Sequence, residues 1–119
     1  MKTWYETPKR SKYGSAKTVV DGITFDSRKE ARRYAELKIL EKVGKIEDLR
    51  LQPEYELIPK YRKNGHTIRR TTYRADFAYI DTETGQLVVE DVKGFRTETY
   101  RLKKKLLEYL YPEITLTEL

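Results

Sequence analysis

Cysteine is absent from the 119-residue chain, and histidine, methionine and tryptophan occur only once each. Without cysteine the chain can form neither a disulfide framework nor a thiolate zinc site. No apolar run approaches about 18 residues, the length that a membrane-spanning helix needs. The N-terminal sequence MKTWYETPKRSKYG also lacks the apolar core of a signal peptide. We therefore expect a soluble protein of the reducing cytoplasm, with a length that fits one domain.

Acidic residues are outnumbered by basic ones, with 19 Asp and Glu against 25 Lys and Arg and a net charge of +6. This balance favours a polyanionic partner, because binding one releases its counterions. Many small basic domains bind no nucleic acid, so charge alone does not identify the partner. The ten tyrosines add stacking surface, although most of them are expected to pack within the domain.

Periodicity and turn residues predict a basic arm over residues 1–16 and a single domain over residues 17–119. The β-prone runs cover residues 17–25, 49–61, 71–81, 86–95 and 114–119, and the helical runs cover residues 25–46 and 97–113. Leaving out the first hairpin, the order is helix, three strands, helix, strand. This order predicts an α/β fold with a mixed central sheet and a helix on each side.

Local signals fix the start of this order. Asp21-Gly22 is a two-residue hairpin turn. The first helix can be capped by Asp26 or Ser27 and ends at Gly44. Glu30 stands three residues after Ser27, as in a capping box.

Three charged residues, Glu90, Asp91 and Lys93, interrupt an otherwise apolar strand in the run VVEDVKGF. Side chains alternate across a strand, so Asp91 and Lys93 share one face and Glu90 takes the other. We assign Glu90 to a structural pair or a contact with a helix. A one-residue change of register would exchange Glu90 with Asp91.

The preceding strand carries Asp76 at a central position where an apolar residue is expected. Alternation predicts one face formed by Tyr73, Ala75, Phe77 and Tyr79, and the other by Arg74, Asp76, Ala78 and Ile80. If the two strands pair through the intervening turn, Asp76 lies near Asp91 and Lys93.

Two carboxylates beside a lysine are typical of a site for a hard cation such as Mg²⁺ or Mn²⁺. The cation polarises a phosphoryl oxygen and lowers the pKa of a bound water, and Lys93 would stabilise the developing charge. The alternative is a plain salt bridge between Asp91 and Lys93 at a sheet edge. The upstream Asp76, the intervening hairpin and Gly94 after the lysine favour the metal site.

These residues resemble the PD-(D/E)XK, or restriction-endonuclease-like, nuclease superfamily. Its signature is an acid on one strand and (D/E)-X-K on the next, here Asp76 and then Asp91-Val92-Lys93. Ala75 stands where the signature has proline. The resemblance implies the αβββαβ nuclease core, which agrees with the order of elements above.

The segments SKYG, VVDGITFDSRKEARRYAEL, LQPEYELIP, YRADFAYID and VVEDVKG together resemble a family of small phage-encoded nuclease-like proteins. Related nucleases carry a further acid on the first helix, at the place of Glu30, and a glutamine-proline pair like Gln52-Pro53. Glu30 has an alternative role as the third residue of the capping box with Ser27.

The resemblance implies a Mg²⁺- or Mn²⁺-dependent DNA endonuclease with Glu30, Asp76 and Asp91 as metal ligands and Lys93 as a further catalytic residue. Branched DNA, such as a four-way junction, is the substrate to test first, and a homodimer is expected because two strands must be cut. A catalytically inactive binding module with the same fold is an alternative. An RNA-binding basic domain would leave the acids within the strands unexplained.

Basic residues near the expected site are candidates for holding DNA. The residues that we assign to this role are Gln52, Arg69, Arg70, Tyr100, Lys103 and Lys104. In the second helix, Leu102, Leu106 and Tyr109 are expected to face the core and leave the lysines toward phosphate or solvent.

Two further basic segments are candidate contacts. The run YRKNGHTIRR predicts a hairpin around Asn64-Gly65 that adds Arg62 and Lys63. His66 is expected to be a turn residue and not a catalytic base. In the arm, Lys9, Arg10 and Lys12 are a third candidate contact, with Trp4 or Tyr5 as an anchor to a second subunit.

Overall fold

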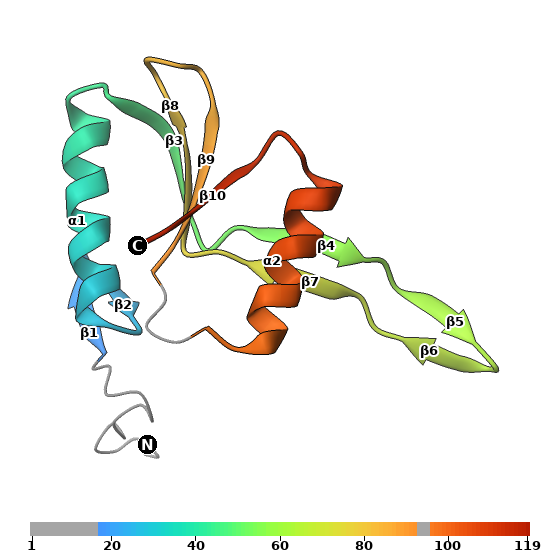
Figure 1. The fold of residues 1–119 in the computed structure, drawn as a ribbon. Coiled ribbons are helices and arrows are strands. Elements are labelled where there is room, and N and C mark those ends of the chain that lie inside the picture. The colour runs from blue at the N-terminus through green and yellow to red at the C-terminus, as the bar shows by residue number, and fades with distance from the viewer. Residues whose placement is uncertain (1–16, 93–95) are drawn as a thin grey trace.

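A four-stranded sheet separates two helices in the structure, which is a computed structural model describing residues 17–92 and 96–119 (Figure 1). The helices are α1 (Arg28–Lys42) and α2 (Glu98–Leu110). The strands are β1 (Thr18–Val20), β2 (Ile23–Phe25), β3 (Ile46–Leu51), β4 (Glu54–Ile58), β5 (Tyr61–Lys63), β6 (His66–Ile68), β7 (Thr71–Arg74), β8 (Phe77–Asp81), β9 (Leu87–Asp91) and β10 (Thr115–Glu118).

The central sheet is mixed and has the strand order β10-β9-β8-β3. Strand β8 pairs in antiparallel fashion with both β3 and β9, whereas β10 pairs with β9 in parallel. Three smaller pairs, β1-β2, β4-β7 and β5-β6, complete the strands. The expected α/β class with a mixed sheet is confirmed, and the elements of the central sheet and its helices follow in the order α1, β3, β8, β9, α2, β10.

Each face of the sheet has its own apolar core. On the α1 side, Tyr34 and Leu37 of the helix pack with Phe77 and Tyr79 of β8. On the other side, Tyr100 and Leu107 of α2 pack with Ala78, Val89 and Leu116 from three neighbouring strands. Because successive side chains of β8 and β9 serve different cores, both central strands are buried on both faces.

The signals at the ends of α1 act as expected. Ser27 caps the helix, because its hydroxyl accepts a hydrogen bond from the backbone N–H of Glu30 at 3.0 Å. Gly44 follows the helix with a φ of 83°, in the left-handed region that favours glycine. The turn pairs Asp21-Gly22 and Asn64-Gly65 also have positive φ at both residues, as two-residue hairpin turns require.

The buried side of α2 differs from the expected one. Leu102 and Tyr109 are 57% and 80% exposed, so the expectation that they face the core is wrong, and Leu106 is only partly buried. The helix docks through Tyr100 and Leu107, which lie seven residues apart on one side. Several apolar stripes run along this helix, and the contact with β4, β7 and β10 determines which of them is buried.

The run that was expected to form one strand over residues 71–81 is divided into β7 and β8. Tyr73 and Ala75 belong to the core on the α2 side, whereas Phe77 and Tyr79 belong to the core on the α1 side. The expectation that these four residues share a face is therefore wrong. The alternation resets at Ala75 and Asp76, where the chain leaves its pairing with β4 and begins its pairing with β3 and β9.

No helix within the described residues is long and apolar enough to cross a membrane. The expected arm over residues 1–16 lies outside the described residues, as do its candidate contacts Lys9, Arg10, Lys12, Trp4 and Tyr5.

Candidate functional site

The break between β7 and β8 places Asp76 where three strands meet. Its backbone N–H donates to the carbonyl of Glu90 on β9 at 3.1 Å, and its own carbonyl accepts from Gln52 N–H at 2.9 Å. Its carboxylate accepts a hydrogen bond from the backbone N–H of Val92 at 2.6 Å. Asp76 is therefore fixed by β9 through both its main chain and its side chain.

Asp91, at the end of β9, lies across from Asp76. Phe77 pairs with Glu90 in the antiparallel register of β8 and β9, so the next position brings Asp76 opposite Asp91. Asp91 is 0% exposed, and the hydroxyl of Tyr73 donates a hydrogen bond to its Oδ2. The structure thus brings together the two strand acids that the sequence singled out.

Glu90 points to the other side of the sheet and forms a structural pair with α1, as expected. Arg33 donates from Nε to Oε1 at 2.8 Å and from Nη2 to Oε2 at 2.6 Å, a two-pronged contact. The hydroxyl of Tyr79 also donates to Glu90. Burial, and next the hydrogen bond with Glu90, raise the pKa of Tyr79 to about 12, and the hydrogen bond with Glu90 raises the pKa of Arg33.

Glu30 lies in the first turn of α1 and is 5% exposed. Its backbone takes part in the cap with Ser27. No three His, Asp or Glu side chains gather closely enough to hold a metal ion within residues 17–92 and 96–119. The combination of Glu30 with Asp76 and Asp91 as a three-acid metal site stays a prediction, and Lys93 lies outside the described residues.

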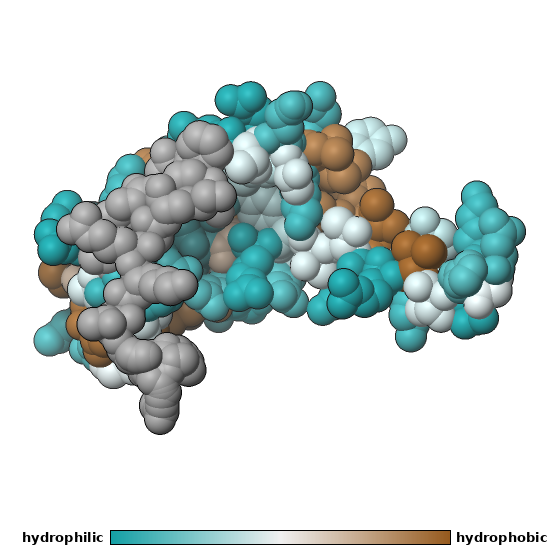
Figure 2. Space-filling model, turned by 90° about the horizontal axis from the view of Figure 1, so that it is seen from below, coloured by the Kyte–Doolittle hydropathy of each residue, from teal (hydrophilic) through white to brown (hydrophobic). Residues whose placement is uncertain are grey.

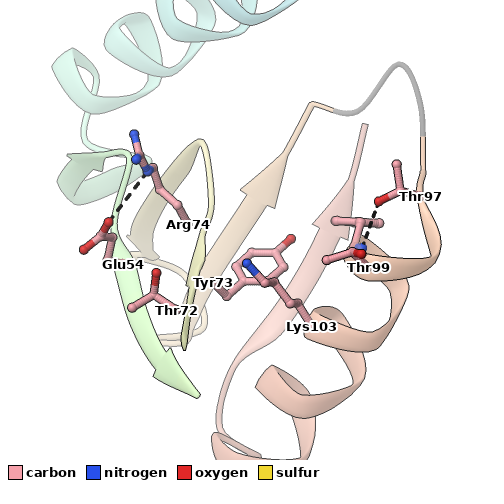
Figure 3. Close-up of a pocket in the computed structure, with 8 residues that line it drawn as sticks. Glu54, Thr72, Tyr73, Arg74, Thr97, Thr99 and Lys103 are labelled. Carbon is pink, nitrogen blue, oxygen red and sulfur yellow. Dashed lines mark hydrogen bonds and ion pairs between the residues drawn. The ribbon is translucent and has the colours of Figure 1, made fainter. Parts of the chain in front are cut away.

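A pocket of about 340 Å³ is formed by residues of β4, of β7 and of the start of α2 (Figure 3). It is lined by Glu54, Thr72, Tyr73, Arg74, Thr97, Thr99, Tyr100 and Lys103. Tyr73 connects it to the site, because this residue both lines the pocket and donates to Asp91. Two cationic side chains and three threonine hydroxyls make the lining suitable for a phosphate group.

Glu54 is the acid of this pocket, and it is paired with arginines. Arg74 Nε lies 3.7 Å from its Oε2, the ion pair drawn in Figure 3, and Arg70 Nη2 lies 3.3 Å from its Oε1. Because these arginines partly neutralise the charge of Glu54, Lys103 gives the pocket a net positive charge.

A second carboxylate, Glu118, lies beside Asp91, although the sequence pattern did not indicate it. The parallel register of β9 and β10 pairs Asp91 with Glu118. Tyr100 donates its hydroxyl to Glu118, and Arg96 and Lys104 lie 3.2 and 3.4 Å from its carboxylate oxygens. The alternation in TLTEL could have placed Glu118 on the same face as Leu116, but only the register between strands far apart in the sequence shows its neighbour.

Tyr100 and Glu118 affect each other's titration. The hydrogen bond from Tyr100 lowers the pKa of Glu118, an effect that burial opposes and Arg96 reinforces. Burial, and next the bond to Glu118, raise the pKa of Tyr100. The two groups form an anchor between α2 and β10 at the border of the site.

The residues assigned to DNA binding have different surroundings. Lys103 and the largely buried Tyr100 line the pocket, whereas Lys104 is paired with Glu118. Arg69 and Arg70 are exposed between β6 and β7. Gln52 is exposed in the turn between β3 and β4 and has a φ of 51°, a left-handed conformation that is uncommon for glutamine.

The chain matches a known protein family over most of its length. The model of a family described as "Protein of unknown function (DUF1064)" matches residues 10–119. The chain matches no curated protein and no solved structure.

Proposed function

The chain belongs to the DUF1064 family, and we propose that it is a metal-dependent DNA endonuclease that hydrolyses phosphodiesters with a metal-activated water. The order of α1, β3, β8, β9, α2 and β10 supports this proposal, because it agrees with the αβββαβ core of the PD-(D/E)XK nucleases that the sequence resembles. Fold likeness alone carries no activity. The proposal therefore depends on the site.

The observation that carries the proposal is the pairing of Asp76 with Asp91 at the ends of two central strands, next to a pocket with a basic lining. A carboxylate that is 0% exposed is costly unless hydrogen bonds or a cation compensate its charge. Tyr73 supplies one hydrogen bond to Asp91. Two carboxylates at facing positions disfavour each other's charge, and a divalent cation bound by both would compensate this.

Mg²⁺ or Mn²⁺ fits the chemistry of this donor set, since both prefer carboxylate oxygens. Asp76 and Asp91 would hold the ion, with Glu30 as a further ligand by resemblance. Such an ion lowers the pKa of a bound water and polarises a phosphoryl oxygen.

The chain's own residues would then position the substrate. Lys103 and Arg74 of the pocket attract a backbone phosphate and hold it near Asp91. Tyr73 orients the Asp91 carboxylate through its hydrogen bond. Lys93 follows Asp91 by two residues, and we assign it to the stabilisation of charge that develops on the phosphate.

Branched DNA is the proposed substrate, and a homodimer is the proposed assembly, because a small domain that cuts two strands often dimerises and C₂ symmetry is the commonest arrangement. The proposed setting is the cytoplasm of a bacterial host in which a phage-encoded protein acts.

A catalytically inactive binding module is the second candidate. The complete burial of Asp91 and its bond to Tyr73 favour it, because a closed carboxylate needs a local rearrangement to reach a substrate. The affinity for a divalent cation distinguishes the two candidate functions, because a binding module does not need a cation at Asp76 and Asp91.

The test is incubation with linear, nicked, forked and four-way DNA, with and without Mn²⁺, for the wild type, Asp91→Asn and Lys93→Ala. We expect cleavage by the wild type only, with DNA binding largely kept in both variants. Asp48→Asn is the matched control, because this acid is exposed and paired only locally, with Arg50 at 2.8 Å. Cleavage at wild-type rates by both variants would remove the proposal.

Calorimetry with Mn²⁺ gives a readout that does not depend on cleavage. The wild type and Asp48→Asn should bind the ion, and Asp76→Asn and Asp91→Asn should lose most of the affinity. Circular dichroism shows whether each variant is folded. A folded wild type without carboxylate-dependent affinity would favour the binding module.

A further inference from the structure

A narrow β-ribbon made of β5 and β6 projects from the body of the domain (Figure 1). Among the helices and strands of the described chain, these two strands contact only each other. Every residue from 61 to 70 is exposed. The ribbon therefore adds nothing to either apolar core.

The ribbon is nevertheless well formed. Tyr61 pairs with Ile68, Arg62 with Thr67 and Lys63 with His66, closed by a two-residue turn. Arg62 reaches across it, donating to Thr67 Oγ1 at 2.7 Å and to the Gly65 carbonyl at 2.9 Å. An isolated two-stranded hairpin is only marginally stable in water. An ordered ribbon without a core contact indicates a role outside the folding of the domain.

The charge of the ribbon has one sign. Residues 59–70 contain five Lys and Arg and no Asp or Glu. Figure 2 shows hydrophilic residues over the outer end of the ribbon, at the right of the view. A basic projection without acids is complementary to a polyanion and not to a mixed protein surface.

The shape of the ribbon favours one class of polyanion, duplex DNA, over duplex RNA. The major groove of B-form DNA is about 12 Å wide and admits a two-stranded β-ribbon. The major groove of A-form RNA is deep and too narrow for side chains to read. We propose that the β5-β6 ribbon enters the major groove of B-form duplex DNA beside the site of cleavage.

Alternation assigns roles to the two faces of the ribbon. Arg62 and Thr67 share one face, and the continuing register adds Lys60 and Arg69 to it. On this face the donors of Arg62 and Thr67 meet base edges, while Lys60 and Arg69 meet phosphates on the two sides of the groove. On the other face, Lys63 reaches a phosphate near the turn.

This inference rests on the proposed function, because it presumes that DNA is the substrate. The experiment is therefore a binding titration without divalent metal, in which cleavage plays no part. The variant Lys63→Ala/Arg69→Ala removes two ribbon cations and leaves Arg62 to hold the turn. The matched control, Lys42→Ala/Lys45→Ala, removes two exposed cations at the end of α1, far from the ribbon in Figure 1.

We expect the ribbon variant to bind a DNA duplex about tenfold more weakly, and its salt dependence to become shallower by about two units. The control should stay within about twofold of the wild type, and Lys63→Arg/Arg69→Lys should restore binding because it keeps the charge. An RNA duplex should bind weakly, with little difference between the wild type and the ribbon variant.

Two results would overturn the inference alone: equal affinity of the ribbon variant and the wild type for DNA, or the same loss on DNA and RNA duplexes. The nuclease proposal would survive both, since cleavage depends on Asp76 and Asp91. Failure of the wild type to bind any DNA would instead remove both proposals.

Discussion

The hydroxyl of Tyr73 on β7 donates a hydrogen bond to the buried carboxylate of Asp91 on β9, although the two strands belong to different sheets. The contact crosses the break at Ala75 and Asp76 and ties the ribbon-bearing β4-β7 pair to the central sheet. The side chain of Tyr73 thus contacts the candidate metal ligand Asp91, lines the basic pocket and belongs to the core on the α2 side.

Tyr73→Phe tests this connection. Loss of the hydroxyl leaves the buried Asp91 carboxylate with one hydrogen bond fewer, so we expect the free energy of unfolding to fall by about 1–3 kcal/mol. Urea denaturation measures the change. Tyr61→Phe, in the exposed ribbon, is the control and should be neutral within about 0.5 kcal/mol. An unchanged free energy of unfolding in Tyr73→Phe would mean that the buried Asp91 carboxylate is not stabilised by this hydroxyl.

Arg33→Ala tests the pair that joins α1 to the sheet. It leaves the Glu90 carboxylate buried without its guanidinium, so we expect a loss of about 3–5 kcal/mol in the free energy of unfolding. Arg50→Ala is the control, because its pair with Asp48 is exposed, and should cost less than about 1 kcal/mol. Equal effects in the two variants would show that the Arg33–Glu90 contact contributes no more than a surface pair.

Glu118→Gln tests the acid that adjoins Asp91. Because the folded state lowers the pKa of Glu118, the charged carboxylate stabilises the fold above the pKa of the unfolded chain, and this contribution is lost as the pH falls through the folded value. The wild type should therefore exceed Glu118→Gln in stability near neutral pH, and the difference should shrink in acid. Urea denaturation between about pH 3 and pH 7 follows it. A difference that is constant over this range would contradict the assignment.

Gln52→Gly separates backbone strain from a role in DNA binding. Glycine accepts the left-handed φ of 51° without steric cost, so the free energy of unfolding should stay the same or rise by up to about 1 kcal/mol. If the Gln52 side chain contacts DNA, affinity should fall in the same protein, as a binding titration can measure. Unchanged affinity would reduce Gln52 to a turn residue.

Local chemistry was enough to predict several elements. The cap at Ser27, the end of α1 at Gly44 and the two-residue turns all depend on neighbours in the sequence, and the structure confirms them. The alternation around Glu90 and Asp91 was also correct, since Glu90 pairs with Arg33 of α1 and Asp91 bonds with Tyr73 of the core on the α2 side.

Long-range pairing accounts for what the sequence did not reveal. The break at Asp76 lies in a continuous β-prone run, and only the change of partner from β4 to β3 and β9 produces it. The buried side of α2 depends on the strands against which it packs, and Leu102 is as apolar as the buried Leu107. Glu118 became a neighbour of Asp91 only through the parallel pairing of β10.

The independence of the β5-β6 ribbon from both cores has a consequence for how this domain can change. Insertions at Asn64-Gly65 would lengthen the projection without disturbing any packed side chain, at about 3.4 Å for each residue added to a strand. Transplanting the hairpin of another family member should likewise leave the thermal midpoint almost unaltered. The ligand that the ribbon recognises can thus change within the family without a change in the stability of the fold.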